Sequence, residues 1–205
     1  MKYIKNFCLF EAVIIPNKIE SNFQITSVED AIDYGRQNDF DVVGYDEFYN
    51  SLTEADKRNA PPKMGIPFFA LFHPERKKPM FVVCEPMVFN FMPMKEIIDD
   101  IIGHELVHAE QSRRKGDNID YSVPNPTDKS AYFSNKEEVM AFSWTIANEL
   151  SKQTRNIKDA IDLLTKGFRG QSYEIWRDIK RNCDEKTINR YKKYIYMYLE
   201  KMFEN

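Results

Sequence analysis

Residues 93 to 116 read PMKEIIDDIIGHELVHAEQSRRKG, and this stretch predicts a long helix. A proline opens it, arginines and a lysine crowd its last turn, and a glycine follows, which is the usual order of helix start and stop signals. Ile101, His104 and His108 recur at helical spacing among other apolar residues. Both histidines are therefore expected to point inward from a largely buried helix.

The pentad from His104 to His108 follows the pattern H-E-x-x-H. Residues four apart on a helix lie on one face, roughly 6 Å apart, so two imidazoles can hold one metal ion such as zinc. Glu105 then projects beside them, where a general base would meet water. Two buried imidazoles without a metal would cost free energy because each ring loses its hydration. The pentad therefore predicts a metal site with His104 and His108 as ligands.

A catalytic zinc ion needs a third protein ligand and keeps its fourth position for water. His73 lies in FFALFHPERKKPMFVV, where a turn between two strands is the simpler interpretation. Glu110 is close in sequence but points to another side of the helix. Arg114 occupies the position, beyond the second histidine, that a histidine or aspartate fills in one common arrangement of zinc sites, so that arrangement is excluded.

A second helix is predicted from Ser134 to Leu150, in SNKEEVMAFSWTIANEL, and acidic residues open it. Ser134 and Glu137 fit a capping box, which gives Glu137 a structural role and leaves Glu138 for the metal. An alternative cap that pairs Asn135 with Glu138 would exchange the two roles. We predict Glu138 as the third ligand and keep Glu137 as the alternative.

HELVHAEQ followed by a distant E-x-x-A, here Glu138 to Ala141, resembles the gluzincin branch of the zincin metallopeptidases. The resemblance implies that His104, His108 and Glu138 bind Zn²⁺ and that Glu105 is the catalytic base. The segment KEEVMAFSW is also similar to small single-domain metallopeptidase-like proteins of phages and other mobile elements.

The chain departs from the gluzincin pattern at one position. Phe142 stands where many gluzincins have an aspartate or asparagine that orients a histidine ligand. Asn148, Thr145 or a backbone carbonyl is therefore expected to orient the histidine here.

The activity implied is hydrolysis of a peptide bond in a protein or peptide substrate. Glu105 takes a proton from water activated by zinc and returns it to the leaving amine. Tyr121 and Tyr132 are the local candidates for stabilising the oxyanion, although packing in a loop is the simpler interpretation of each. Two alternatives stay open: a metal-stabilised binding or virion-associated protein that cleaves nothing, and a regulatory protease of a mobile element.

The predicted fold is one zincin-like α+β domain over residues 1–205, with a mixed α/β lobe at 1–92 and a helical lobe at 93–205 that carries the metal site. SVEDAIDYGRQN predicts a helix opened by Ser27, and DEFYNSLTEADKRN predicts helical or turn segments. PFFALF and PMFVVCE predict two strands of a hairpin. By resemblance, one of these strands would bind the substrate backbone by β-addition.

Composition fits a small cytoplasmic enzyme without a membrane span. The 205 residues, 42% of them hydrophobic, are enough for a real core. An apolar run near the N-terminus is interrupted by Glu11 and lacks a small-residue cleavage site, which argues against a signal peptide. The three cysteines, Cys8, Cys84 and Cys183, are scattered, so we expect them to be reduced and buried.

Positive charge is concentrated in the last part of the chain. Residues 151–205 hold 13 Lys or Arg against 8 Asp or Glu, whereas the whole chain has a net charge of −3. RYKKYIYMYLEKMF interleaves basic and aromatic residues, which favours nucleic-acid binding as one interpretation. Tyr191, Tyr194 and Tyr198 recur at helical spacing, however, so a helix packed against the domain is the preferred interpretation, and Trp144 and Trp176 are expected in the core.

Overall fold

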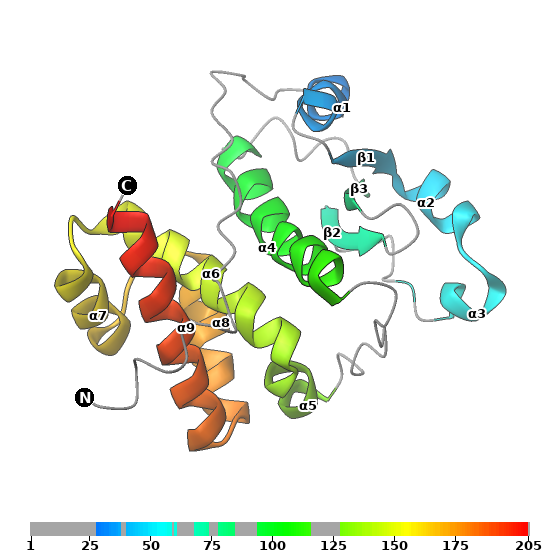
Figure 1. Cartoon of the computed structure of the whole chain (residues 1–205). Coiled ribbons are helices and arrows are strands. Elements are labelled where there is room, and N and C mark those ends of the chain that lie inside the picture. Colours follow the sequence, from blue (N-terminus) through cyan, green and yellow to red (C-terminus); the bar gives the residue numbers. More distant parts are fainter. Residues whose placement is uncertain are drawn as a thin grey trace. The chain divides into compact units, whose positions relative to one another are not determined.

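The computed structural model describes residues 28–37, 40–58, 60, 68–73, 78–84, 94–115 and 128–204. These residues divide into two compact units, one within Asn17–Asp117 and the other within Asn118–Asn205. The first unit combines a small sheet with helices, and the second is helical in its described part (Figure 1). The chain is therefore α+β, as the sequence predicts.

Three strands form the sheet of the first unit, in the order β1-β3-β2: β1 (Asp41–Gly44), β2 (Phe68–His73) and β3 (Lys78–Val83). β2 and β3 are antiparallel, with Phe68 opposite Val83 and His73 opposite Lys78, which confirms the predicted hairpin strands. β1 runs parallel to β3 and was not predicted. Four residues are too few for a periodic pattern to stand out.

Four helices accompany the sheet: α1 (Val28–Gln37), α2 (Tyr45–Ser51), α3 (Glu54–Lys57) and α4 (Met94–Lys115). The first three confirm the helical segments predicted in SVEDAIDYGRQN and DEFYNSLTEADKRN. Ser27, the expected start of the first of them, lies outside the described residues. α4 confirms the long helix predicted around the H-E-x-x-H pentad.

The sheet packs helices on both of its faces, because successive side chains of a strand point to opposite sides. Phe81 and Val83 of β3 belong to one core cluster, together with Ile102 of α4. Met80 and Val82 of β3 belong to the other cluster. The first cluster also contains Tyr34 and Phe40, and the second contains Val43 and Phe48 of α2. The sheet therefore lies between α4 on one face and α2 on the other.

α4 belongs to the unit of the sheet and packs against β2 and β3. Ile101 and Leu106 flank Ile102 in the contact with the first core cluster. The predicted helical lobe at 93–205 places this helix with the helices that follow it, whereas the strands that precede it cover its apolar side. The single domain with lobes at 1–92 and 93–205 stays a prediction, because it concerns how the two units combine.

Gly35 provides a test of the close approach between α1 and the start of β1. The Phe40 amide donates a hydrogen bond to the Gly35 carbonyl at 3.0 Å. A Cβ at position 35 would lie 2.8 Å from the Phe40 oxygen and 2.9 Å from Cγ2 of Val42. We expect Gly35→Ala to lower the free energy of unfolding by about 1–3 kcal/mol, despite the better helix propensity of alanine.

Gly44→Ala is the matched control in the same unit. A Cβ at Gly44 would meet no atom within 4 Å, so we expect a change of less than about 1 kcal/mol. Urea denaturation followed by circular dichroism measures both variants. Equal stability of the two variants would contradict the close packing inferred at Gly35.

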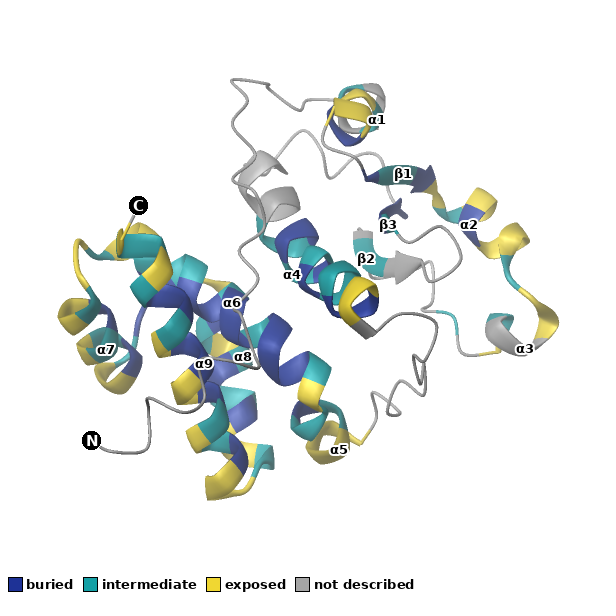
Figure 2. Cartoon of the chain, in the orientation of Figure 1, coloured by how far each residue is buried: buried dark blue, intermediate teal, exposed yellow. Residues whose placement is uncertain are grey.

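Five helices make up the described part of the second unit: α5 (Lys129–Ser134), α6 (Lys136–Gln153), α7 (Ile157–Lys166), α8 (Gln171–Asn182) and α9 (Glu185–Glu204). α6 packs along α9 and also contacts α7 and α8. Its buried side runs the length of the helix (Figure 2). Trp144 and Trp176 are both buried, which confirms the expectation that they anchor the core.

Three of the tyrosines of α9 are part of this core. Tyr191, Tyr194 and Tyr198 are all buried, and the Tyr191 hydroxyl donates a hydrogen bond to the Phe133 carbonyl at 2.9 Å. Burial is the main reason that the pKa of the Tyr191 phenol is raised well above its ordinary value. The preferred interpretation of RYKKYIYMYLEKMF, a packed amphipathic helix, is confirmed, and these rings are not exposed for stacking on bases.

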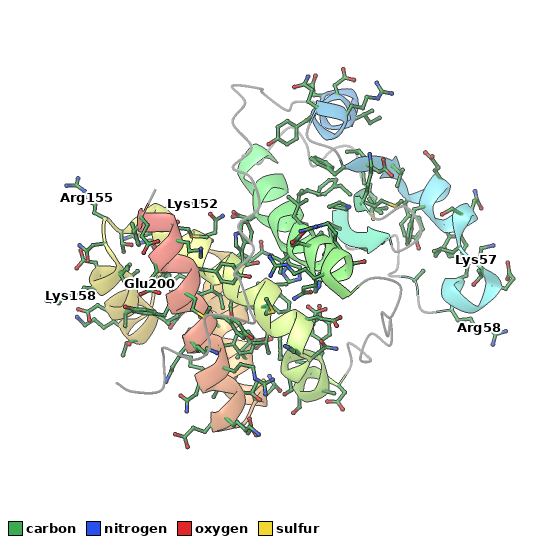
Figure 3. The ribbon with its side chains drawn as sticks, viewed as in Figure 1. Lys57, Arg58, Lys152, Arg155, Lys158 and Glu200 are labelled. Carbon is green, nitrogen blue, oxygen red and sulfur yellow. The ribbon has the colours of Figure 1, made fainter. Side chains whose placement is uncertain are left out.

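Exposed basic side chains lie elsewhere on the second unit. Arg155 and Lys158 point away from the helices into solvent (Figure 3).

Among the described residues, no helix combines the length and the apolar run that crossing a bilayer requires. Cys84 and Cys183 are free thiols, the first buried and the second half-buried, so the prediction of full burial is wrong for Cys183. Cys8 lies outside the described residues.

Candidate metal centre

The two histidines of α4 bring their ring nitrogens together. His104 and His108 lie one helical turn apart, with ring centroids separated by 5.0 Å and ring planes inclined by 73°. Their Nε2 atoms are 3.3 Å apart. Because Ile102 and Leu106 face the sheet, the rotation of the helix about its axis is set, and both imidazoles leave it in a common direction.

The distance between these nitrogens fits a shared metal ion. Zinc binds imidazole nitrogen at about 2.0–2.1 Å with tetrahedral angles, which places two such nitrogens about 3.3–3.4 Å apart. The observed separation is 3.3 Å. Both side chains are half-buried, so they are shielded from bulk water without being sealed from it.

Gln111 contacts the other nitrogen of the second histidine. Nδ1 of His108 lies 3.0 Å from the amide oxygen Oε1 of Gln111, and the glutamine is buried. The predicted candidates for such a partner were Asn148, Thr145 or a backbone carbonyl, and Gln111 was not among them. Gln111 is three residues after His108, on the same face of the helix, so the spacing alone could have indicated it.

Glu105 lies between the histidines in sequence and is buried, with 9% of its surface exposed. A carboxylate beside a metal site serves as a general base when it can reach water bound there. The role of Glu105 as the base stays a prediction, and the structure adds that its side chain is buried.

Glu138 is the buried glutamate at the start of α6, with 8% of its surface exposed, whereas Glu137 is only half-buried. The predicted capping box at Ser134 is wrong. The N-cap of α6 is Asn135, whose side chain accepts a hydrogen bond from the Glu137 amide at 2.8 Å. Ser134 cannot cap α6 because it is the last residue of α5.

By the capping argument alone, Asn135 at the N-cap would have favoured Glu137 as the ligand. The structure favours Glu138 for a different reason, which is burial. One ligand atom from each of His104, His108 and Glu138 lies within 4.8 Å of the others, and this group could hold a metal ion. Two imidazole nitrogens and a carboxylate oxygen are a donor set suited to zinc.

The other candidate ligands are engaged elsewhere or lie outside the description. Glu110 receives hydrogen bonds from Arg113 at 2.6 Å and from Arg114 at 2.8 Å, and the hydrogen bond from Arg113 is the main reason that its pKa is lowered to about 2. His73 ends β2, and its side chain is not among those described. The Glu110 carboxylate is therefore engaged by these two arginines.

Of the two tyrosines considered for the oxyanion, only Tyr132 is described. It lies in α5 and packs on Phe133 and Phe142, with ring centroids 5.5 Å and 5.9 Å away. These contacts fit the packing interpretation of Tyr132. Tyr121 lies outside the described residues.

No model of a known protein family matches the chain, and none of the curated proteins or solved structures is detectably similar to it. The site must therefore be interpreted from its own geometry.

The two neighbouring glutamates of α6 give the metal group its first test. We expect about one zinc ion per chain, lost in His104→Ala and bound at least about tenfold more weakly in Glu138→Gln, because each substitution removes a ligand. Elemental analysis and competition with a chromogenic chelator measure content and affinity. Glu137→Gln is the matched control and should bind zinc as the wild type does. The reverse order of the two glutamine variants would assign the ligand to Glu137.

The ion pairs of Glu110 give a second test, on stability against pH. The lowered pKa means that the ionised Glu110 stabilises the fold above the ordinary pKa of 4.5, and that this stabilisation is lost as the pH falls toward about 2. In the presence of a chelator, Glu110→Gln should be less stable than the wild type by about 0.5–1 kcal/mol at pH 6. The difference should vanish near pH 2 in urea titrations. A difference independent of pH would contradict the role of the charge.

Proposed function

We propose that the protein is a zinc-dependent metallopeptidase with a zincin-like site, in which His104, His108 and Glu138 hold the metal. The observation that carries the proposal is the pair of imidazole nitrogens 3.3 Å apart beside the buried Glu105. Free thiols at Cys84 and Cys183 fit a reducing compartment such as the cytoplasm.

The donor set supports a catalytic site more than a structural one. Structural zinc sites are usually closed by four protein ligands, often cysteines, whereas catalytic sites use three and leave a position open. Within the part of the chain that the structure describes, the group offers three residues and no cysteine. A zinc ion bound by them would lower the pKa of a water molecule and polarise a substrate carbonyl.

Glu105 would act first as the general base and then as the general acid. Its carboxylate accepts the proton of the attacking water and later returns it to the nitrogen of the leaving amine, so the proton count balances over the cycle. Burial of Glu105 keeps bulk water from competing for that carboxylate. The ligands themselves move no proton in this scheme.

The substrate backbone is proposed to pair with β2. The hairpin offered two candidate strands, but β3 has neighbours on both sides, β1 and β2, while β2 has only β3 within the described sheet. β2 also packs against α4, which carries the histidines. An extended peptide could therefore add to the edge of β2 by main-chain hydrogen bonds.

The variant Glu105→Gln tests the proposal. It should keep zinc and the fold but cleave a quenched fluorescent peptide library at least about 100-fold more slowly, because the amide cannot accept the proton. Zinc content, circular dichroism and the rate of fluorescence increase are measured on the same preparation. Glu110→Gln, which changes a glutamate of the same helix, is the control and should leave the rate unchanged.

Two outcomes would overturn the proposal. Cleavage at the wild-type rate in Glu105→Gln would remove Glu105 from the mechanism. A wild-type protein that holds zinc but cleaves neither the library nor unfolded casein would favour the alternative, a metal-stabilised binding protein without catalysis.

A further inference from the structure

The amide oxygen of Gln111 lies in hydrogen-bonding distance of Nδ1 of His108, at 3.0 Å. An amide oxygen can only accept a hydrogen bond. A hydrogen bond from a neutral imidazole to that oxygen requires the proton on Nδ1 and leaves a lone pair on Nε2. That nitrogen is the one that faces His104.

We propose that Gln111 is a positioning residue that sets the tautomer and the ring orientation of His108 for metal binding. The inference rests on the proposed function because it assigns Gln111 a role in metal binding. The contact between Gln111 and His108 itself lies within α4. Metal-bound histidines commonly donate their second N–H to an acceptor, which orients the ring and makes the ligand more basic. Gln111 would orient the ring in this way without adding a negative charge.

Burial makes the contact stronger than it would be at the surface. Gln111 is 8% exposed, and a buried amide that lost its partner would retain the full cost of desolvation. The pairing of Gln111 with His108 therefore serves both residues: it satisfies the amide and holds the ring. A leucine at this position has a similar volume but no acceptor, so it would fill the space without holding the ring of His108.

The tautomer is measured directly in the metal-free protein. Long-range ¹H–¹⁵N correlation spectra at a pH of about 8, above the ordinary histidine pKa of about 6.5, should show His108 protonated at Nδ1. His108→Gln assigns the signals. Protonation of His108 at Nε2 in the wild type would overturn the inference without any variant having to fold.

Zinc affinity supplies the second measurement. Gln111→Leu should bind zinc about 10–100-fold more weakly in competition with a chromogenic chelator, and its His108 should lose the preference for Nδ1 protonation. Gln111→Glu keeps an acceptor and should restore the tautomer and at least the wild-type affinity. Ser112→Ala, which removes the neighbouring buried polar side chain, is the control and should change neither.

The outcomes separate this inference from the proposed function. If the wild type binds no zinc, the proposed function fails, while the tautomer still decides the role of Gln111. If the wild type binds zinc and Gln111→Leu keeps both the affinity and the tautomer, the role of Gln111 is wrong and the metal site stands.

Discussion

The packing of α4 against the sheet is the contact on which the candidate site depends. Ile102 and Leu106 lie against the core that Phe81 and Val83 of β3 help to form. Each residue of a helix is rotated by about 100° from the one before it, so covering this side fixes where every other side chain points. The direction of the two imidazoles is therefore a consequence of apolar packing on a strand that carries none of the chemistry.

A short part of α4 holds most of the groups that the proposed chemistry requires. The stretch from His104 to Gln111 supplies two nitrogens 3.3 Å apart, a buried carboxylate and an acceptor for the second imidazole. Such proximity needs no long-range folding because residues three and four apart on a helix are neighbours. Glu138 is the exception, since its place at the buried start of α6 depends on how the second unit is built.

Particular residues show where prediction from the sequence succeeded and failed. β2 and β3 were predicted because aromatic and branched residues form two clear runs, but β1, which lies beside β3, is only Asp41–Gly44 and carries no comparable signal. The spacing of Ser134 to Glu137 fits a capping box, but Ser134 is already the last residue of the preceding helix, α5. Gln111 was not predicted as the partner of His108, although it lies only three residues away on the same helix.

The sequence by itself determined α4 and the presence of His104, Glu105 and His108 on it, because helical periodicity and the spacing of metal ligands are local properties. It also determined that the chain mixes strands and helices. Only the tertiary structure decided that α4 packs on the sheet, that β2 is an edge strand of the described sheet, and that Glu138 is more buried than Glu137. Burial and strand order depend on contacts between segments far apart in the chain. A local sequence pattern does not indicate which of these segments are in contact.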